Sequence, residues 1–200
     1  MCFFLRNFAP RNLIYTIMAR GNSWKTRNRT NADYGRPGRQ VVKREFRGEP
    51  QYTLDKLYIS PFTRRKRWDE DGHWQYIAME RNLTPTGITV MDDYLRYLAS
   101  GNSDMQAFAD RYGLKREEVG AMVFILTGIR GIRFRQLYQM RLVDDLLRYT
   151  DMDKKEVARR SGLGSENNMY LALRREYNMG IGERRRFLRK EGDLGRFAVA

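Results

Sequence analysis

The sequence has a single cysteine, Cys2, and a single histidine, His73, among its 200 residues. One cysteine excludes an intramolecular disulfide and every cysteine-rich zinc site, and it is typical of a reducing compartment. One histidine leaves only carboxylates as further metal ligands. We therefore predict no metal site, and we expect His73, which follows Gly72, to be an ordinary turn residue.

Long apolar runs are missing as well. The most apolar stretch, residues 1–20, is interrupted by Arg6, Pro10 and Arg11, so it is too short and too broken to cross a membrane. It also lacks the order of a signal peptide, in which positive charge precedes an unbroken apolar run. A plainer hypothesis for this stretch is that translation starts at Met18. We expect no membrane association.

Catalytic patterns are equally scarce. The sequence shows no nucleophile with a base partner and no cluster of metal ligands, and Gly162-Leu163-Gly164 lies inside a helical pattern as a turn rather than as a phosphate-binding loop. We predict that the protein is not an enzyme and that it requires no cofactor.

Positive charge, in contrast, is abundant. The chain has 38 basic and 24 acidic residues, a net charge of +14 and a pI near 10.1. Such an excess favours a polyanionic partner, because each phosphate that a basic side chain neutralises releases condensed counterions. With 42% hydrophobic residues, the chain can bury one or two modest cores, which predicts one ordered domain and an extension.

Residues 154–177 carry the most specific pattern. Residues 154–160 predict a short helix with an apolar inner face, and residues 166–177 predict a second helix. Between them, Gly162 and Gly164 supply a turn. Two short helices joined by a glycine turn form a helix-turn-helix pattern.

The second predicted helix has two different faces. Met169, Leu173 and Tyr177 recur at i, i+4 and i+8 and predict a packed face, and Ser165 is placed to cap the helix. The remaining positions are available to a partner: Asn167, Tyr170, Leu171, Arg174 and Arg175.

This segment resembles the C-terminal half of the AraC/XylS family of bacterial transcription regulators. In that family a short helix, a glycine, an apolar residue, a recognition helix with two buried residues four apart, two basic residues and an aromatic follow one another. The matching residues here are Val157, Ala158, Gly162, Leu163, Met169, Leu173, Arg174, Arg175 and Tyr177. In the closing turn Asn178 stands where the family has glycine, and asparagine tolerates the left-handed conformation.

The resemblance continues upstream. Residues 88–100 match the family's opening helix, positions between Met105 and Gly128 match its first helix-turn-helix unit, and residues 140–147 match its linker helix. It therefore covers residues 87–190. It implies a mainly α fold in which two helix-turn-helix units are joined by a linker helix, and regulation of transcription by sequence-specific binding of double-stranded DNA in a bacterial cytoplasm, on the nucleoid.

In the family, the second helix of each unit enters a major groove. For the second unit, the resemblance implies that the side chains facing the bases are Glu166, Asn167, Tyr170 and Leu171. Asn167 suits adenine, Glu166 suits cytosine N4, and Tyr170 and Leu171 suit a thymine methyl. The implied phosphate contacts are Arg174 and Arg175, with Arg159, Arg160, Lys154 and Lys155 as lesser candidates. The alternative is an ordinary solvated helix on which Leu171 packs inside the domain.

The first unit departs from the family. The positions that match the readers hold Glu117, Glu118, Gly120 and Ala121, which repel phosphate or cannot reach a base, and Phe124 and Ile125 replace the basic pair that follows the buried Met122 and Val123. We expect Phe124 and Ile125 to form a protein interface, covered by residues 40–79 or by another subunit. The alternative is that the first unit still contacts a groove of the DNA, but more weakly. In that case the DNA backbone would be held by Arg116, Arg130, Arg133 and Arg135.

This departure supports a second functional hypothesis. The domain would keep the fold but bind another regulator or RNA polymerase, with weak and non-specific affinity for DNA. The oligomeric state stays open between a monomer and a homodimer.

The remaining segments complete the expected organisation. Residues 1–39 predict a flexible basic arm that tracks DNA through Arg27, Arg29, Arg36 and Arg39, or else a solvated tail.

Residues 40–86 predict a small aromatic-rich extension with a β-hairpin, in which 41–46, 57–59 and 74–78 are β-prone and the basic run 64–67 is a solvated turn. This extension is too short for the sensor domain of the family, so we predict no effector pocket in it. Residues 191–200 predict a frayed end.

Overall fold

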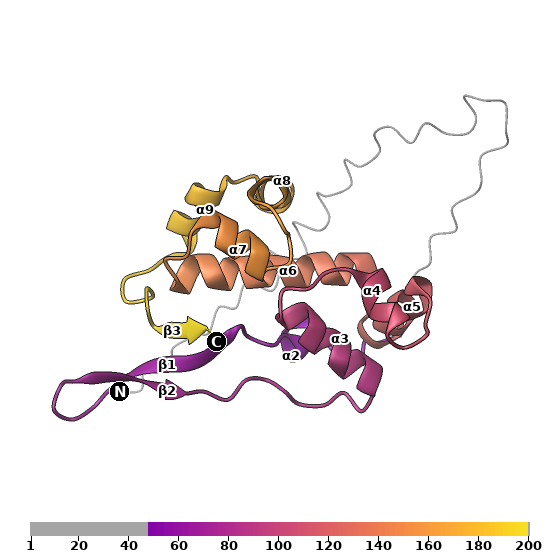
Figure 1. Cartoon of the computed structure of the whole chain (residues 1–200), viewed down its shortest axis with the longest axis horizontal. Helices are drawn as coiled ribbons and strands as arrows, with labels where there is room; N and C mark the ends of the chain where they lie inside the picture. The colour runs from indigo at the N-terminus through magenta and orange to yellow at the C-terminus, as the bar shows by residue number, and fades with distance from the viewer. Residues whose placement is uncertain (1–47, 200) are drawn as a thin grey trace, which may run out of the picture. The chain divides into compact units, whose positions relative to one another are not determined.

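The computed structural model describes residues 48–199, which are coloured in Figure 1. The predicted arm, residues 1–39, and the β-prone run 41–46 lie outside the described residues. The elements follow one another as α2 (Leu54–Leu57), β1 (Phe62–Trp68), β2 (Trp74–Ala78), α3 (Thr89–Ala99), α4 (Met105–Asp110), α5 (Arg116–Thr127), α6 (Gly131–Tyr149), α7 (Lys154–Arg160), α8 (Glu166–Tyr177), α9 (Ile181–Leu188) and β3 (Phe197–Val199). The described part of the chain is mainly helical, as predicted.

The long helix α6 belongs to two hydrophobic cores. Phe134, Tyr138 and Leu142, one helical face, pack in a first core with α3, α4 and α5. Val143 and Leu147, nearer the C-terminal end and on another face, pack in a second core with α7, α8 and α9. Figure 1 shows α6 running between these two groups of helices. The predicted linker helix is therefore present and is longer at both ends than the matching residues 140–147.

The boundaries of both helix-turn-helix units follow from local chemistry. The Asp153 side chain accepts from the N–H of Glu156 and caps α7, and the Ser165 side chain accepts from the N–H of Asn168 and caps α8. Asn178 ends α8 in the left-handed conformation, at φ 56°. These ends confirm the predicted helices 154–160 and 166–177.

Two glycines set the contact between the units. Gly101 follows α3 and Gly162 follows α7, and both have positive φ, 81° and 77°. A Cβ on Gly101 would lie 2.6 Å from the carbonyl oxygen of Arg160, and a Cβ on Gly162 would lie 2.9 Å from that of Gly101. The Gln139 side chain of α6 also donates to the Gly162 carbonyl oxygen at 2.8 Å. The two units thus meet backbone to backbone, where a side chain has no room.

The sheet has the order β2-β1-β3 and is antiparallel throughout. The predicted hairpin and the strand at 74–78 are confirmed, but two local predictions were wrong. The run 64–67 lies within β1 rather than in a turn, because Phe62 at the start of the strand is buried and pairing with β2 continues to Trp68 opposite Trp74. The segment 57–59 ends α2 and continues as a buried connector, not as a strand.

The aromatic side chains of this extension divide into two sets. Tyr58 and Phe62 are buried against the helices, whereas Trp68 and Trp74 are 60% and 51% exposed near the hairpin tip. The Nζ of Lys66 lies 5.0 Å and 4.3 Å from the two indole ring centroids. Lys66, Trp68 and Trp74 thus interact across the hairpin by cation–π attraction, and the two indole rings are not buried.

The C-terminal segment is not frayed, so that expectation was wrong. β3 pairs with β1, and the ring of Phe197 lies 5.3 Å from Phe62 and 4.8 Å from Tyr149. The Asp193 carboxylate is 4% exposed and accepts from Arg148 Nε at 2.7 Å. Ring packing and this ion pair hold the end of the chain. The helix α9 before it was not anticipated, because its residues 183–186 are all charged.

No helix within residues 48–199 is both long and apolar enough to cross a membrane.

We predict that Gly101→Ala lowers the free energy of unfolding more than Gly87→Ala does. Both glycines have φ 81°, so each substitution adds strain of about 1–3 kcal/mol. Only at Gly101 does the new Cβ also meet backbone, since nothing lies within 4 Å of a Cβ on Gly87. Urea unfolding of the two variants measures the difference, and equal losses would contradict the backbone contact between the units.

Candidate nucleic-acid interface

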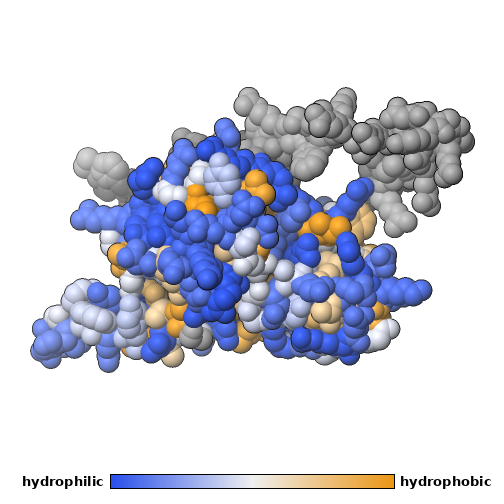
Figure 2. Space-filling model, turned by 45° about the horizontal axis from the view of Figure 1, so that its top comes forward, coloured by the Kyte–Doolittle hydropathy of each residue, from blue (hydrophilic) through white to orange (hydrophobic). Residues whose placement is uncertain are grey.

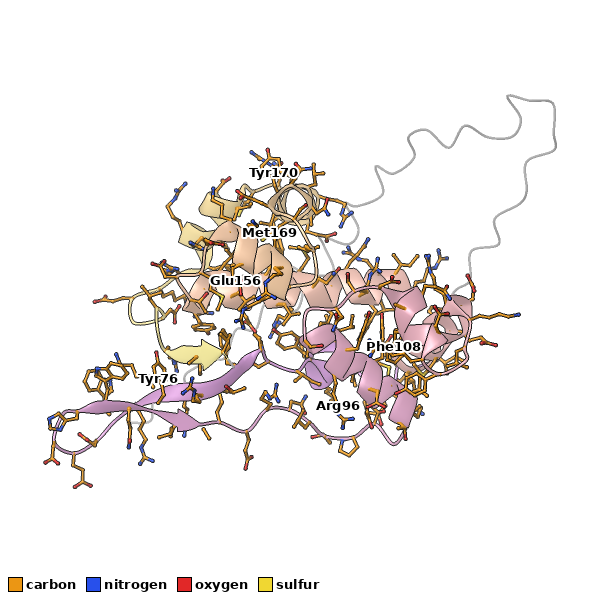
Figure 3. All side chains as sticks on the ribbon, in the orientation of Figure 1. Tyr76, Arg96, Phe108, Glu156, Met169 and Tyr170 are labelled. Atoms are coloured by element: carbon orange, nitrogen blue, oxygen red, sulfur yellow. The ribbon has the colours of Figure 1, made fainter. Side chains whose placement is uncertain are left out.

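The helix α8 is buried on one side and open on the other. Met169 and Leu173 are fully buried in the second core, and Ala172 is 5% exposed. The side chains predicted to face bases are all exposed, with Tyr170 at 40% and Leu171 at 56%. Figure 3 shows Met169 pointing into the domain and Tyr170 pointing out of it. The alternative in which Leu171 packs inside the domain is therefore wrong.

The spacing of the exposed positions places them on one face. Glu166, Asn167, Tyr170, Leu171 and Arg174 follow one another at the i, i+1, i+4, i+5 and i+8 positions of a helix, so they form one stripe along α8. A helix with such a stripe has the dimensions to enter the major groove of B-form DNA. Figure 2, which brings this side of the molecule forward, shows a mostly hydrophilic surface broken by small apolar patches.

Ion pairs fix α8 against the linker helix. Arg133 of α6 donates through Nη1 and Nη2 to the two carboxylate oxygens of Glu176, at 2.6 and 2.8 Å. Burial works to raise the pKa of Glu176, but the hydrogen bonds and charge of Arg133 outweigh it and hold the pKa below its usual value. Arg133 was named only in the alternative in which the first unit keeps a weakened groove role, and in the structure it bonds to Glu176 of α8.

A second set of contacts ties α8 and α6 to α9. Arg184 donates to both oxygens of Asp144 at 2.9 and 2.6 Å, and the Tyr177 hydroxyl donates to Asp144 at 3.0 Å. The Arg184 guanidinium lies 3.6 Å from the Tyr177 ring centroid. Burial opposes the charge on Arg184, but the hydrogen bond to Asp144 raises its pKa overall. Sequence analysis missed Arg184, since its role depends on a partner 40 residues away.

Most of the predicted phosphate contacts are paired within the protein. Lys154 Nζ lies 3.5 Å from Glu166, and Arg175 Nε lies 3.3 Å from Glu176. Arg159 and Arg160 both donate to Glu156, and these hydrogen bonds hold the pKa of Glu156 at about 2. Exposed pairs of this kind are weak, on the order of 0–1 kcal/mol, so a phosphate can replace the carboxylate at small cost.

Arg174 has a different environment. It donates to the Tyr170 hydroxyl at 3.2 Å and to the carbonyl oxygen of Asn178 at 3.0 Å, and its guanidinium lies 5.5 Å from the Tyr170 ring centroid. These partners are neutral, so among the described residues no carboxylate cancels its charge. They also hold the guanidinium beside the exposed stripe, which places a positive charge at the edge of the face.

The charge around α8 is positive, whereas the charge of the first unit is balanced. Residues 154–177 hold six basic and three acidic side chains, and residues 105–127 hold three of each. Residues 178–190 add five basic and one acidic side chain next to α8. Of these five, Arg184, Arg185 and Arg189 bond to protein groups, while Arg186 and Lys190 are exposed. Arg186 and Lys190 are candidates that sequence analysis did not single out.

The first unit keeps the fold without a comparable stripe. Val119, Val123 and Leu126 are buried, whereas Met122, which we expected to be buried, is only half-buried. The Glu118 carboxylate accepts from the N–H of Lys115 at 2.7 Å and so serves the helix end.

The close approach of α5 and α6 depends on Gly131 at the start of α6. A Cβ on Gly131 would lie 2.8 Å from the Cα of Gly120, so the absence of a side chain at Gly131 lets the two helices meet. Nothing lies within 4 Å of a Cβ on Gly120, which the resemblance places at a reader position.

The apolar pair of α5 is only partly covered in the described structure. Phe124 is half-buried, and Ile125 is 65% exposed. Residues of the extension do reach this helix, because the Tyr52 N–H donates to the carbonyl oxygen of Leu126 at 3.1 Å and the Tyr52 hydroxyl donates to that of Thr86 at 2.9 Å. This contact lies at the end of α5 and leaves Ile125 open.

The hairpin tip brings together three groups that could ligate a metal. The ligand atoms of Asp69, Asp71 and His73 lie within 4.8 Å of one another, and all three residues are exposed. The turn itself accounts for two of them, since the Asp69 carboxylate accepts from the N–H of His73 at 2.7 Å. His73 is thus the turn residue that the sequence predicted.

No protein-family model matches the sequence, and no curated protein matches it. Among solved structures, the chain is similar to the C-terminal domain of the two-component response regulator yesN from Fusobacterium nucleatum, at 14% identity and a TM-score of 0.43, over 48% of this chain and 94% of that one. It is similar to the C-terminal domain of AraT, a response regulator from Geobacillus stearothermophilus, at 16% identity and a TM-score of 0.47, over 55% and 91%. It is also similar to the DNA-binding domain of AdpA, a global transcriptional factor solved with a target DNA, at 22% identity and a TM-score of 0.43, over 50% and 88%.

We predict that Glu176→Gln destabilises the protein by about 1–3 kcal/mol at neutral pH, because it leaves Arg133 with a weaker partner. The lowered pKa of Glu176 means that the wild type gains this stability above the ordinary Glu pKa and loses it as the pH falls through the folded value. The difference between variant and wild type should therefore shrink below about pH 4. Urea unfolding at several pH values measures it.

The matched control for this comparison is Glu80→Gln, since Glu80 is exposed. This variant should change the unfolding free energy little at any pH. A loss for Glu176→Gln that stayed constant down to pH 3 would show that the ionised pair with Arg133 does not stabilise the fold.

Proposed function

We propose that this protein is a sequence-specific DNA-binding transcription regulator that contacts the major groove mainly through α8. The observation that carries the proposal is the outer face of α8, which combines exposed side chains able to contact base edges with Arg174, while the opposite face is packed and held by the Arg133–Glu176 pair. A groove-reading helix has to be rigid, exposed and flanked by positive charge, and α8 meets each requirement.

Base reading is assigned to the exposed stripe. Asn167 can form two hydrogen bonds with adenine, and Leu171 four residues later can meet a thymine methyl. Tyr170 adds apolar contact, and its hydroxyl is already bonded to Arg174. Glu166 forms an ion pair with Lys154 at 3.5 Å, and both side chains are half-exposed. Once this weak pair is broken, the Glu166 carboxylate can accept a hydrogen bond from cytosine N4. We propose that sequence preference comes from these four side chains.

Phosphate binding is assigned to the basic side chains around the stripe. Arg174 and Arg175 lie at the C-terminal end of α8, and Lys154, Lys155, Arg159 and Arg160 belong to α7. Because four of these six form ion pairs with carboxylates of the protein, binding exchanges these weak intramolecular pairs for phosphate. Such contacts position the protein and make its affinity depend on salt.

The remaining organisation is proposed on the same basis. Residues 87–190 form the DNA-binding part, residues 40–86 are an extension that packs on it, and residues 1–39 are a basic arm that adds affinity for the backbone. The balanced charge of the first unit supports the proposal that the second unit reads the DNA. The activity belongs in a bacterial cytoplasm, on the nucleoid, with RNA polymerase or another regulator as a further partner and with a homodimer as one state in which it could act.

We predict that replacing both Arg174 and Arg175 with Ala removes most DNA binding and lowers the slope of log Kobs against log salt by about 2. Each arginine contributes one phosphate contact, and each contact releases about one counterion. Fluorescence anisotropy with duplexes selected from a random genomic pool, across a salt series, measures affinity and slope.

The control is the double replacement of Arg64 and Arg65 with Ala. It removes the same charge from exposed positions of β1. A melting curve of each variant shows whether the fold survives, since Arg174 also bonds to the C-terminal cap of α8. Equal effects of the two double variants would mean that only net charge matters, and they would overturn the assignment of α8.

A second candidate function follows from Ile125, an aliphatic side chain that is 65% exposed on a helix with balanced charge. In this alternative, Phe124 and Ile125 bind another regulator or RNA polymerase, and DNA binding is weak and non-specific.

We predict that Ile125→Asp leaves the affinity for DNA within about twofold, because an exposed position outside the α8 stripe makes no contact with the groove. If the interaction module is correct, the same variant instead lowers association with RNA polymerase in pull-down experiments and leaves a DNA affinity that was already non-specific. Ile132→Asp, a similarly exposed change on α6, is the matched control.

A further inference from the structure

A cleft of about 440 Å³ opens where the two helix-turn-helix units meet the extension. The first unit contributes Arg96 and Ala99 of α3, the second contributes Arg160 at the end of α7, and the connectors before β1 and after β2 contribute Ile59, Arg81 and Leu83. The volume lies in the range of small-molecule sites, about 300–1,000 Å³. Asn82 keeps the connector after β2 in place, because its side chain donates to the carbonyl oxygen of Lys56 at 2.5 Å.

The cleft carries positive charge from three separate elements. Arg96 pairs with Asp93 at 2.7 Å, and Arg160 pairs with Glu156 at 2.6 Å, but neither carboxylate lines the cleft. Within residues 48–199 the exposed Arg81 has no acidic partner. Since no described acidic residue lines this cleft, an anion that enters it meets three guanidinium groups. Arginine binds carboxylates and phosphates through paired hydrogen bonds, which adds geometry to charge.

The wall between the arginines is apolar. Ile59 is 5% exposed and forms part of the first core, and Ala99 is half-buried. Leu83 is 49% exposed although it is a large aliphatic residue. A ligand with an apolar body would cover Leu83 while its charged group met the arginines. We propose that this cleft binds a small organic anion, with a carboxylate or phosphate group on an apolar ring or chain.

The cleft is separate from the proposed DNA face. In Figure 3, Arg96 lies on the side of α3 that faces away from α8, while Tyr170 lies on the outer face of α8. A duplex held by Tyr170 and its neighbours therefore approaches from the other side of the molecule. Arg81 and Arg96, which the proposed function does not assign to DNA, are consequently available to a ligand other than the phosphates of that duplex, whereas Arg160 at the end of α7 is a candidate for both.

The position of the cleft gives its ligand a regulatory role. Ser100, which lines the cleft, precedes Gly101, and Gly101 touches the backbone of Arg160. An anion bridging Arg96 and Arg160 holds α3 and α7, and so the two units, in one arrangement. This coupling to DNA rests on the proposed function, whereas binding of the anion does not.

The test is calorimetric titration of the full chain with phenyl phosphate, inorganic phosphate and the neutral benzyl alcohol. We expect saturable 1:1 binding of phenyl phosphate. Inorganic phosphate should bind at least about tenfold more weakly than phenyl phosphate, because it lacks the apolar contact, and benzyl alcohol should not bind because it lacks the charge. Arg81→Gln should lower the affinity for phenyl phosphate at least about tenfold, because it removes one charged hydrogen-bond donor to the phosphate group. Arg81 is exposed, so this variant folds.

Two control variants locate the site. Arg67→Gln removes the same charge from an exposed position of β1 outside the cleft, and Arg174→Gln removes it from the proposed DNA face. Both should leave phenyl phosphate binding within about twofold of wild type. Absence of saturable binding, equal losses in Arg81→Gln and Arg67→Gln, or a loss confined to Arg174→Gln would each overturn the proposed cleft site.

DNA affinity measured with and without phenyl phosphate separates this proposal from the proposed function. Anion binding that depends on Arg81 in a protein that does not bind DNA would support the site and refute the DNA reader. Specific DNA binding together with no binding of phenyl phosphate would support the DNA reader and refute the cleft site. Where both occur, a change of DNA affinity that Arg81→Gln abolishes would establish the coupling.

Discussion

The structure depends on one helix that has to satisfy two cores. Because α6 presents Phe134, Tyr138 and Leu142 to the first unit and Val143 and Leu147 to the second, neither unit can bury its apolar face without it. The apolar face of α6 therefore changes along its length: the N-terminal part of the helix packs in the first core, and the C-terminal part packs in the second on another face. The Gly101–Gly162 contact then closes the units on each other beside α6. Two small domains that would each be marginal alone share one continuous support.

Polar contacts decide how α8 lies on that support. The apolar face of α8 holds the helix against the second core, but apolar contacts have little directional preference and so do not fix its rotation. The bidentate pair of Arg133 and Glu176 and the contacts among Arg184, Asp144 and Tyr177 have strict geometry, so they set the rotation of α8 about its axis. The cost of burying these charges is met by pairing each of them. Rotation of α8 in turn determines which side chains face outward.

Electrostatic asymmetry separates the two units although their folds are alike. Around α8 basic side chains outnumber acidic ones, and the weak pairs they form on the surface can be exchanged for phosphate. In the first unit Glu118 bonds to the N-terminal end of its own helix, so this position, which would face a groove, serves the fold instead. The close approach of α6 to α5 depends on Gly131. The same fold thus carries the proposed reading surface on one unit only, and it leaves a basic cleft where the two units join the extension.

The sequence by itself determined the local structure: α7, α8 with its Ser165 cap, the turn at Asn178, the linker helix and the hairpin with its strand at 74–78. Each depends on residues within a few positions of one another, through helical periodicity, capping hydrogen bonds or turn propensity. The sequence also identified the exposed stripe of α8, because period 3.6 separates Asn167 and Leu171 from Met169 and Leu173.

Only the tertiary structure decided the features that join distant residues. The run 64–67 looked like a turn until the buried Phe62 and pairing with β2 made it a strand, and residues 197–199 looked frayed until Phe197 found Phe62 and Tyr149. The sequence did not indicate that Arg133 of α6 pairs with Glu176 of α8, or that Arg184 of α9 pairs with Asp144 of α6. The physical reason is that strand pairing, ion pairs and close backbone approach take their energy from partners far along the chain, and no local pattern encodes the identity of a distant partner.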